Sequence, residues 1–341
     1  MNPKAGGVSL YINRVFIMND CAELIPEYMR FLRGVIDSDD LSLNISREIL
    51  QDEPIIRVIR RSTQRKVFNE LKKILENDRE KYEKFWAAFG RVFKEGVIQD
   101  REHSKTILDL ALFRTTKDEN WTTLAAYKER MKPDQEGIYC LAGRELSALR
   151  ASPKLEPFAK KGYEVLLMTD PVDEVILADA GVLDEGLKLV NVGVGSVTPE
   201  DGEEKKAAEE KLKGMEAEFA PLKEQAMSTL ADKLEDVRPT LALTDSPACL
   251  RDSPNGFSVQ MEQLLRAAGQ TPPPQKRILE LNVEHPLIKK LMEMAGRKDA
   301  QAADLLSILY DQSLILEGAA IADPAAFVKR LNDFMTRTLG A

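Results

Sequence analysis

Strand-like and helix-like segments alternate between residues 138 and 194, and this alternation constrains the fold more than any other feature of the sequence. Strands are predicted at 138–141, 163–168 and 188–194. Between them lie a helix at 153–161 closed by Gly162 and a second helix opened by Asp170 and Pro171. Alternation of this kind produces right-handed βαβ units and a mainly parallel sheet. We therefore predict a small α/β/α domain over residues 120–200.

The preceding segments predict a strand followed by helices. Residues 10–18 are rich in β-branched and apolar side chains, which favours a strand, and residues 21–31 carry apolar side chains at helical spacing. A polar loop is predicted at 37–44. From Asp52, a credible N-cap, the pattern is strongly helical, and an aromatic stripe from Tyr82 to Phe93 is typical of a core helix. We assign residues 1–52 to the end of a large α/β/α unit and 53–119 to a helical connector.

The C-terminal part predicts an α+β domain over residues 201–341. A charge-dense run at 201–213 indicates a solvated helix at the domain boundary. An amphipathic helix at 219–234 follows, then a β-hairpin made by 237–243 and 248–251, and a strand at 278–281. Two apolar helices, split by Asp323 and Pro324, end the chain. The predicted fold class is multidomain α+β and α/β: a helical connector, a small α/β/α sandwich and a C-terminal domain ending in a helix pair.

Composition excludes several classes of function. The 341 residues carry a formal charge of −8 and a pI near 5.2, which argues against binding nucleic acid. No apolar run is long enough to span a membrane, and residues 1–7 lack a secretory signal. The two histidines do not lie within metal-ligand spacing of a cysteine, so no metal is expected. The three well-separated cysteines favour reduced thiols and a cytoplasmic location.

No complete catalytic set can be identified in the sequence. A phosphate-binding GxxxxGK[ST] loop is lacking, and the VGVGS sequence at 192–196 is without the third glycine and acidic partner of a dinucleotide site. No motif supports a nucleophile paired with a base. A stand-alone α/β enzyme is therefore disfavoured.

Two apolar surfaces are candidates for binding. Phe257, Met261, Leu264 and Leu265 share one face of a helix flanked by loops, which suits adaptable binding by an exposed face; a core helix is the alternative. The two terminal helices are the candidate dimer interface, as an isologous four-helix bundle, through Leu305, Leu309, Leu314, Phe327, Leu331 and Phe334. Burial of these residues within one chain is the alternative.

Three stretches resemble the heat-shock-protein-ninety family of molecular chaperones, bacterial HtpG type. They are VFIMNDCAELIPEYMRFLRGVIDSDDLSLNISREILQ at 15–51, KKGYEVLLMTDPVDE at 160–174 and AAGQTPPPQKRILELNVEHP at 267–286, followed by the DQSLILEG and DPAAFVKRLN segments. The similarity runs from about Val8 to the C-terminus, and NISRE with the preceding DSDDLSL is very specific. The family order is an ATP-binding domain, a middle domain and a C-terminal dimerisation domain, and this sequence begins partway through the middle domain.

The resemblance implies that residues 44–51 form the catalytic loop, which reaches ATP held by another domain. Arg47 would contact the γ-phosphate, with Asn44 and Gln51 as supporting polar groups; a permanently charged, planar guanidinium suits that role. It also implies that Phe257, Met261, Leu264 and Leu265 contact unfolded or partly folded client proteins. ATP and Mg would serve the full-length protein, and we expect neither to bind this chain alone.

Two functions from different classes follow. The chain is either the client-binding and dimerising part of an ATP-dependent, heat-shock chaperone, inactive as an ATPase alone, or an ATP-independent holdase or interaction scaffold complete as it stands. A split gene, an internal start and an expression fragment each account for the missing domain. Homodimerisation and client proteins are the expected interactions, with no nucleic acid and no membrane.

Overall fold

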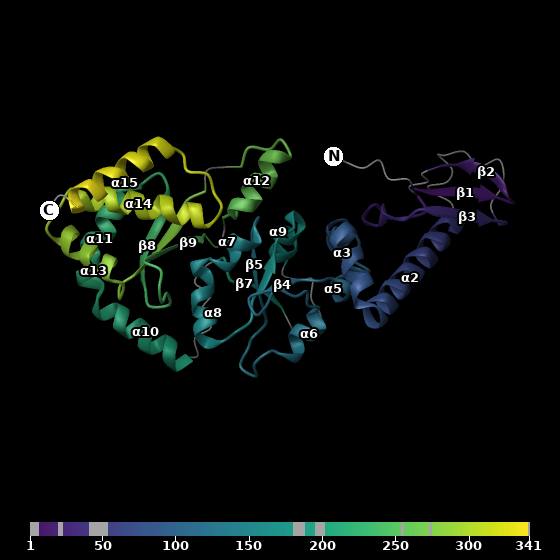
Figure 1. Ribbon diagram of the computed structural model, residues 1–341, viewed down its shortest axis with the longest axis horizontal. Coiled ribbons are helices and arrows are strands. Elements are labelled where there is room, and N and C mark those ends of the chain that lie inside the picture. Colours follow the sequence, from purple (N-terminus) through teal and green to yellow (C-terminus); the bar gives the residue numbers. More distant parts are fainter. Residues whose placement is uncertain are drawn as a thin grey trace. The chain divides into compact units, whose positions relative to one another are not determined.

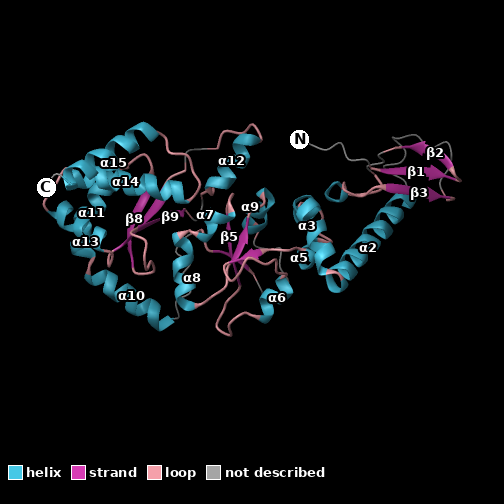
Figure 2. Ribbon diagram, viewed as in Figure 1, coloured by secondary structure: helices cyan, strands magenta, loops and turns pink. Residues whose placement is uncertain are grey.

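A computed structural model describes residues 7–19, 23–40, 54–179, 188–194, 202–253, 256–272 and 275–339 (Figures 1 and 2). The chain divides into two compact units. The first contains residues 1–113, 121–130 and 181–185, and the second contains residues 114–120, 131–180 and 186–341. None of the helices in the described parts of the chain is long and apolar enough to cross a membrane.

The first unit contains a three-stranded sheet in the order β2-β1-β3, formed by β1 (Val8–Ile12), β2 (Val15–Met18) and β3 (Gly34–Ser38). Strand β1 runs antiparallel to β2 and parallel to β3. The single strand predicted over 10–18 is wrong, because Asn13 and Arg14 adopt φ of 48° and 64° and reverse the chain between β1 and β2. Strand β3 was not predicted, and it occupies the start of the predicted loop.

The helix predicted over 21–31 is also wrong in the part that the structure describes, from residue 23 onward. Only a short 3₁₀ turn, η1 (Glu27–Met29), forms there. Pro26 directly precedes this turn, and a proline inside a helix removes a backbone hydrogen bond and clashes with the preceding turn. The apolar stripe is nevertheless buried, since Leu24, Tyr28 and Met29 are all inaccessible to solvent.

The two long helices of the connector are confirmed. The helices of this unit are α2 (Pro54–Asn77), α3 (Arg79–Lys94), α4 (Gly96–Gln99), α5 (Ser104–Leu110) and α6 (Leu124–Glu129). Asp78 separates α2 from α3 and caps α3, since its Oδ1 accepts a hydrogen bond from the Lys81 amide at 3.1 Å. Tyr82, Trp86 and Phe93 are buried, which confirms the core reading for these residues, whereas Phe89 of the same stripe is 40% exposed.

The second unit begins with a four-stranded sheet in the order β4-β6-β5-β7. Its strands are β4 (Arg114–Thr115), β5 (Ile138–Ala142), β6 (Leu166–Met168) and β7 (Leu189–Asn191). Strand β5 is parallel to both β6 and β7, which confirms the predicted mainly parallel sheet. Its helices are α7 (Leu146–Arg150), η2 (Pro153–Leu155), α8 (Glu156–Lys161) and α9 (Pro171–Ala178). Gly162 ends α8 with φ of 66°, the left-handed conformation expected of a glycine at that position.

The C-terminal sheet has the order β8-β10-β9 and consists of β8 (Leu234–Thr240), β9 (Ala248–Asp252) and β10 (Arg277–Asn282). The predicted hairpin between 237–243 and 248–251 is wrong, because β10 lies between β8 and β9. Strand β10 is parallel to β8 and antiparallel to β9, and all its residues are buried. The central position therefore goes to the strand that buries both faces.

The remaining helices are α10 (Gly202–Gly214), α11 (Glu216–Thr229), α12 (Val259–Ala267), α13 (Pro286–Gly296), α14 (Gln301–Leu316) and α15 (Pro324–Leu339). Helix α10 contains no buried residue, as the charge-dense sequence predicted. Figure 2 shows α11, α13 and α14 beside the C-terminal sheet, and their apolar side chains share one core with it, including Leu222, Leu291 and Leu306.

Polar side-chain contacts join the small sheet and its helix α8 to the C-terminal sheet and its loops. The Arg251 Nη1 donates to the Val192 carbonyl at 2.7 Å, and its Nε donates to Glu280 Oε2 at 3.0 Å. The Glu156 carboxylate accepts hydrogen bonds from the backbone amides of residues 244–246. The two sheets of this unit are therefore held together by side chains, not only by chain connectivity.

Candidate functional site

The candidate catalytic residues Asn44, Arg47 and Gln51 lie outside the described residues, which resume at Pro54. Their role therefore stays a prediction. Among the residues that the structure does describe, no three His, Cys, Asp or Glu side chains converge as metal ligands. Cys140 and Cys249 are free and buried, and burial raises the pKa of Cys249 to about 11, so that thiol is unreactive at neutral pH.

Helix α12 carries three of the four predicted binding residues, and Phe257 lies two residues before its start. We call Phe257, Met261, Leu264 and Leu265 the α12 face. Phe257 is 39% exposed and the other three side chains are partly exposed. The α12 face is therefore not part of a closed core, which was the alternative that the sequence left open.

Ser258 fixes both the start of α12 and its attachment to the small sheet. Its Oγ accepts a hydrogen bond from the Met261 amide at 3.0 Å, which is the N-cap contact. The same hydroxyl donates to Glu174 Oε2 of α9 at 2.8 Å. One side chain thus begins the helix and ties it to its neighbour α9.

Arg277, at the start of β10, anchors the other side of α12. Its guanidinium donates to Glu262 Oε1 of α12 at 2.7 Å and to the Phe257 carbonyl at 2.9 Å, and it is ion-paired with Asp252. The Arg277 side chain is only 6% exposed, and burial lowers its pKa. Charged contacts therefore hold α12 from beneath and leave its apolar face toward solvent. Sequence reasoning missed this anchor, whose only signal was an arginine beginning a strongly apolar strand.

A groove of about 230 Å³ lies between α9 and α12. Leu264 and Ala267 line it from α12, and Pro171 and Glu174 line it from α9. Val175, also on α9, is 36% exposed. Apolar side chains from two helices thus border one groove, and Val175 is an exposed apolar residue of α9 outside its lining.

The terminal helices divide into a buried part and an exposed part. Leu305 and Leu309 of α14 are 6% and 3% exposed and belong to the chain's own core, so their side chains offer no surface to a partner. For Leu305 and Leu309 the structure thus agrees with the alternative named above, burial within one chain. Leu314 and Phe334 pack partly against the same core, and Phe327 and Leu331 are partly exposed. The exposed apolar residues that the sequence did not single out are Ile315, Leu316, Val328 and Met335, at 40–51% exposure.

The comparisons with known proteins cover the whole chain. A family model described as "Hsp90 protein" matches residues 1–341. The chain is 44% identical to the Chaperone protein HtpG of Alkalilimnicola ehrlichii over 338 residues, which are 97% of this chain and 51% of that protein. It is 43% identical to the proteins of the same name from Treponema denticola, over 97% of this chain and 52% of that protein, and Mycolicibacterium gilvum, over 98% and 52%. The chain thus spans about half the length of the curated relatives it matches.

Proposed function

The chain belongs to the Hsp90 protein family, and from this premise we propose that it supplies the client-binding and dimerising part of an ATP-driven molecular chaperone. ATP hydrolysis in this proposal requires a further domain, because the sequence has no GxxxxGK[ST] loop and the relatives are about twice as long. The clients are unfolded or partly folded proteins, which expose the apolar side chains that a folded protein buries.

The observation that carries the proposal is the exposure of the α12 face together with its rigid attachment. Leu264 and Ala267 border the groove from α12, and Phe257, just before this helix, is 39% exposed. Arg277 and Ser258 fix the backbone of this segment through their contacts with Glu262, Phe257 and Glu174. Methionine and leucine side chains adapt to varied apolar partners. A held helix with an adaptable apolar face suits binding of many unrelated client segments.

Suppression of client aggregation tests the α12 face. We expect this chain to reduce light scattering by a heat-denatured model enzyme, and the double substitution Phe257→Ser, Met261→Ser to abolish most of that effect, because it removes apolar contact area. Val58→Ser is the matched control, since Val58 is a 66% exposed apolar side chain on α2. Equal suppression by the double variant and the wild type would remove α12 from client binding.

The same assay separates the two candidate functions. The α12 face is formed by this chain alone, which favours some holding of clients without nucleotide. Both candidates therefore expect suppression by the isolated chain. In a chimera that carries an ATP-binding domain in cis, suppression that increases with ATP and Mg supports the first candidate, and suppression that nucleotide leaves unchanged supports the second, an ATP-independent holdase or scaffold.

For the phosphate-contacting loop we propose Arg47 as the residue that meets the γ-phosphate, supported by Asn44 and Gln51. Arginines in this role contribute on the order of 10³–10⁵ in rate in other nucleotide hydrolases. In a chimera with an ATP-binding domain, Arg47→Ala should lower ATP turnover strongly. Arg33→Ala, which removes an exposed arginine nearby in sequence, is the control. Unchanged turnover in Arg47→Ala would exclude the role.

For dimerisation we propose the exposed apolar residues of α14 and α15 as the contact surface. Val328→Glu with Met335→Glu should convert a dimer to a monomer in light scattering, because two charges would be buried without partners. Deleting residues 302–341 is a poorer test, since it removes Leu305 and Leu309 from the core. A monomeric mass for the unmodified chain would contradict the proposal.

A further inference from the structure

The small sheet reverses its direction of growth beside β5. The chain passes from β5 to its neighbour β6, and then from β6 back past β5 to β7 on the other side. Right-handed crossovers place the two connections on opposite faces of the sheet, which leaves a crevice outside the carboxyl ends of β5 and β7. Open parallel sheets bind ligands in the crevice at such a switch point.

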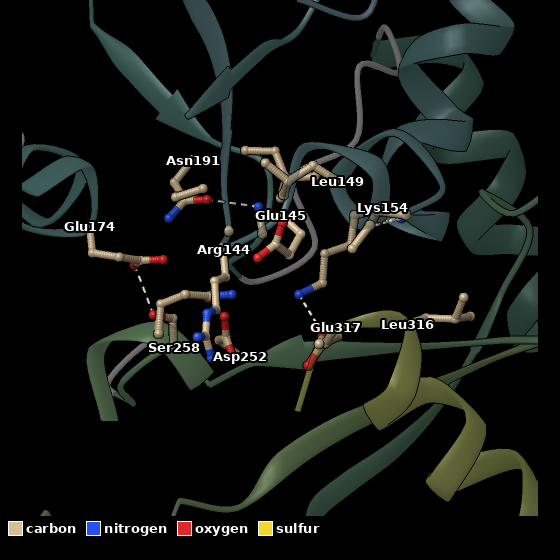
Figure 3. Close-up of a pocket in the computed structure, with 18 residues that line it drawn as sticks. Arg144, Glu145, Leu149, Lys154, Glu174, Asn191, Asp252, Ser258, Leu316 and Glu317 are labelled. Atoms are coloured by element: carbon tan, nitrogen blue, oxygen red, sulfur yellow. Dashed lines mark hydrogen bonds and ion pairs between the residues drawn. The ribbon is translucent and has the colours of Figure 1, made fainter. Parts of the chain in front are cut away.

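A cavity of about 200 Å³ lies at this position (Figure 3). The carboxyl end of β5 lines it with residues 141–143, and the end of β7 lines it with Asn191 and Gly193. The C-terminal part of the unit supplies the opposite side through Asp252, Ser258 and residues 316–318. The cavity is smaller than a drug-sized site, so it fits a compact ligand.

Negative side chains outnumber positive ones in the lining. The charged lining residues are Glu145, Glu174, Asp252 and Glu317 against Arg144 and Lys154. Asp252 is ion-paired with Arg277, and Glu317 lies with its Oε1 2.5 Å from the Lys154 Nζ. Asp252 and Glu317 are therefore compensated. The remaining charged lining residues are Glu145, Glu174 and Arg144, which leave a net charge of −1.

Of Glu145 and Glu174, only Glu174 is buried, with 7% exposure. Its Oε2 accepts a hydrogen bond from Ser258, but no described residue donates one to Oε1. Figure 3 shows the second oxygen of this carboxylate directed toward the cavity. Burial raises the pKa of Glu174, which means that its surroundings compensate the negative charge poorly. A cationic donor in the cavity would supply the missing compensation.

We propose that this cavity binds an organic cation, an alkylammonium or guanidinium group, which donates a hydrogen bond to Glu174 Oε1. A bare metal ion fits less well, because no three potential ligand side chains converge anywhere in the described residues. The same chemical group occurs in free amines and in the lysine and arginine side chains of polypeptides. The inference does not depend on the chaperone proposal, since it rests on the sheet topology and the lining charges.

Isothermal titration calorimetry of the whole chain with agmatine tests the inference, since agmatine carries an ammonium and a guanidinium on a short chain. We expect Glu174→Gln, which keeps the side-chain volume and can still accept from Ser258, to weaken binding about tenfold or more. Arg144→Gln should strengthen binding several-fold, because it removes a like charge from the lining. Glu293→Gln, an exposed carboxylate on α13, should leave the affinity unchanged.

The opposite signs separate a local effect from misfolding, since loss of structure would weaken binding in both variants. A second arm uses a capped arginine-containing peptide. Binding of agmatine identifies a free amine as a sufficient ligand, and binding of the peptide alone identifies a polypeptide side chain as the source. The inference would be overturned if neither probe bound, or if Glu174→Gln bound agmatine with the affinity of the wild type. Weaker binding of agmatine by Arg144→Gln would also overturn it.

Discussion

Replacing Arg251 with methionine should destabilise the second unit by about 3–5 kcal/mol, the range for removing one partner of a buried ion pair. The Arg251 and Glu280 side chains are 1% and 7% exposed, and the Nε–Oε2 distance is 3.0 Å. The substitution leaves the Glu280 charge buried without its guanidinium, and it also removes the donor to the Val192 carbonyl.

Two spectroscopic probes distinguish unfolding of the second unit from unfolding of the first. The only tryptophans, Trp86 and Trp121, both lie in the first unit, so their fluorescence reports that unit. Far-UV circular dichroism reports the helices of both units. For a unit of this size, a loss of about 3–5 kcal/mol lowers the midpoint of thermal unfolding by roughly 6–20 °C. We expect Arg251→Met to shift a dichroism transition and leave the fluorescence transition in place.

The double substitution Arg251→Met, Glu280→Leu is the matched control. It replaces the pair with apolar side chains, and such replacements of buried ion pairs are often neutral or stabilising. The double variant should therefore recover to within about 1 kcal/mol of the wild type. A loss below about 1 kcal/mol in the single variant, or a double variant as unstable as the single one, would refute the reasoning.

Three further outcomes follow from the described contacts. Glu156→Gln should cost about 1–2 kcal/mol at pH 7 in urea unfolding. Burial raises the pKa of Glu156, but hydrogen bonds from residues 244–246 outweigh burial and lower the pKa below its ordinary value. The difference in unfolding free energy should therefore vanish as the pH falls through the lowered pKa, and a difference that stays constant with pH would contradict this. Ser258→Ala should cost about 1 kcal/mol of helix capping and speed amide exchange in α12, whereas unchanged exchange would show that the cap is dispensable. Gly162→Ala should cost about 1 kcal/mol in thermal unfolding because its φ of 66° disfavours a side chain, and an unchanged midpoint would count against that strain.

Local sequence patterns predicted the two long connector helices and much of the small sheet. The break between α2 and α3 at Asp78, the left-handed Gly162 and the start of α9 at Pro171 each depend on a few neighbouring residues, which is why they could be predicted. The false hairpin between β8 and β9 shows the limit of such patterns. Pairing between strands depends on a third strand about thirty residues further along the chain, and a local pattern carries no information about it.

The candidate sites show the same division between what local patterns predict and what long-range contacts decide. Spacing alone placed Phe257, Met261, Leu264 and Leu265 on one helical face, since helical periodicity is a local property. Whether that face is exposed depended on contacts from Arg277 of β10 and Glu174 of α9, and Glu174 is 84 residues from its partner Ser258 in the sequence. The same holds for α14, where equal apolar spacing covers both the buried Leu309 and the exposed Leu316.

The sequence by itself determined the family, the long helices of the connector and the faces on which apolar residues gather. These properties follow from residue identity and from periods of two to four residues. Only the tertiary structure decided strand order, which leucines of the terminal helices are available to a partner, and how Glu174 comes to face a cavity. The physical reason is that burial and charge compensation depend on residues brought together from distant parts of the chain, and Glu174, Ser258 and Arg277 become neighbours only once the two sheets have packed.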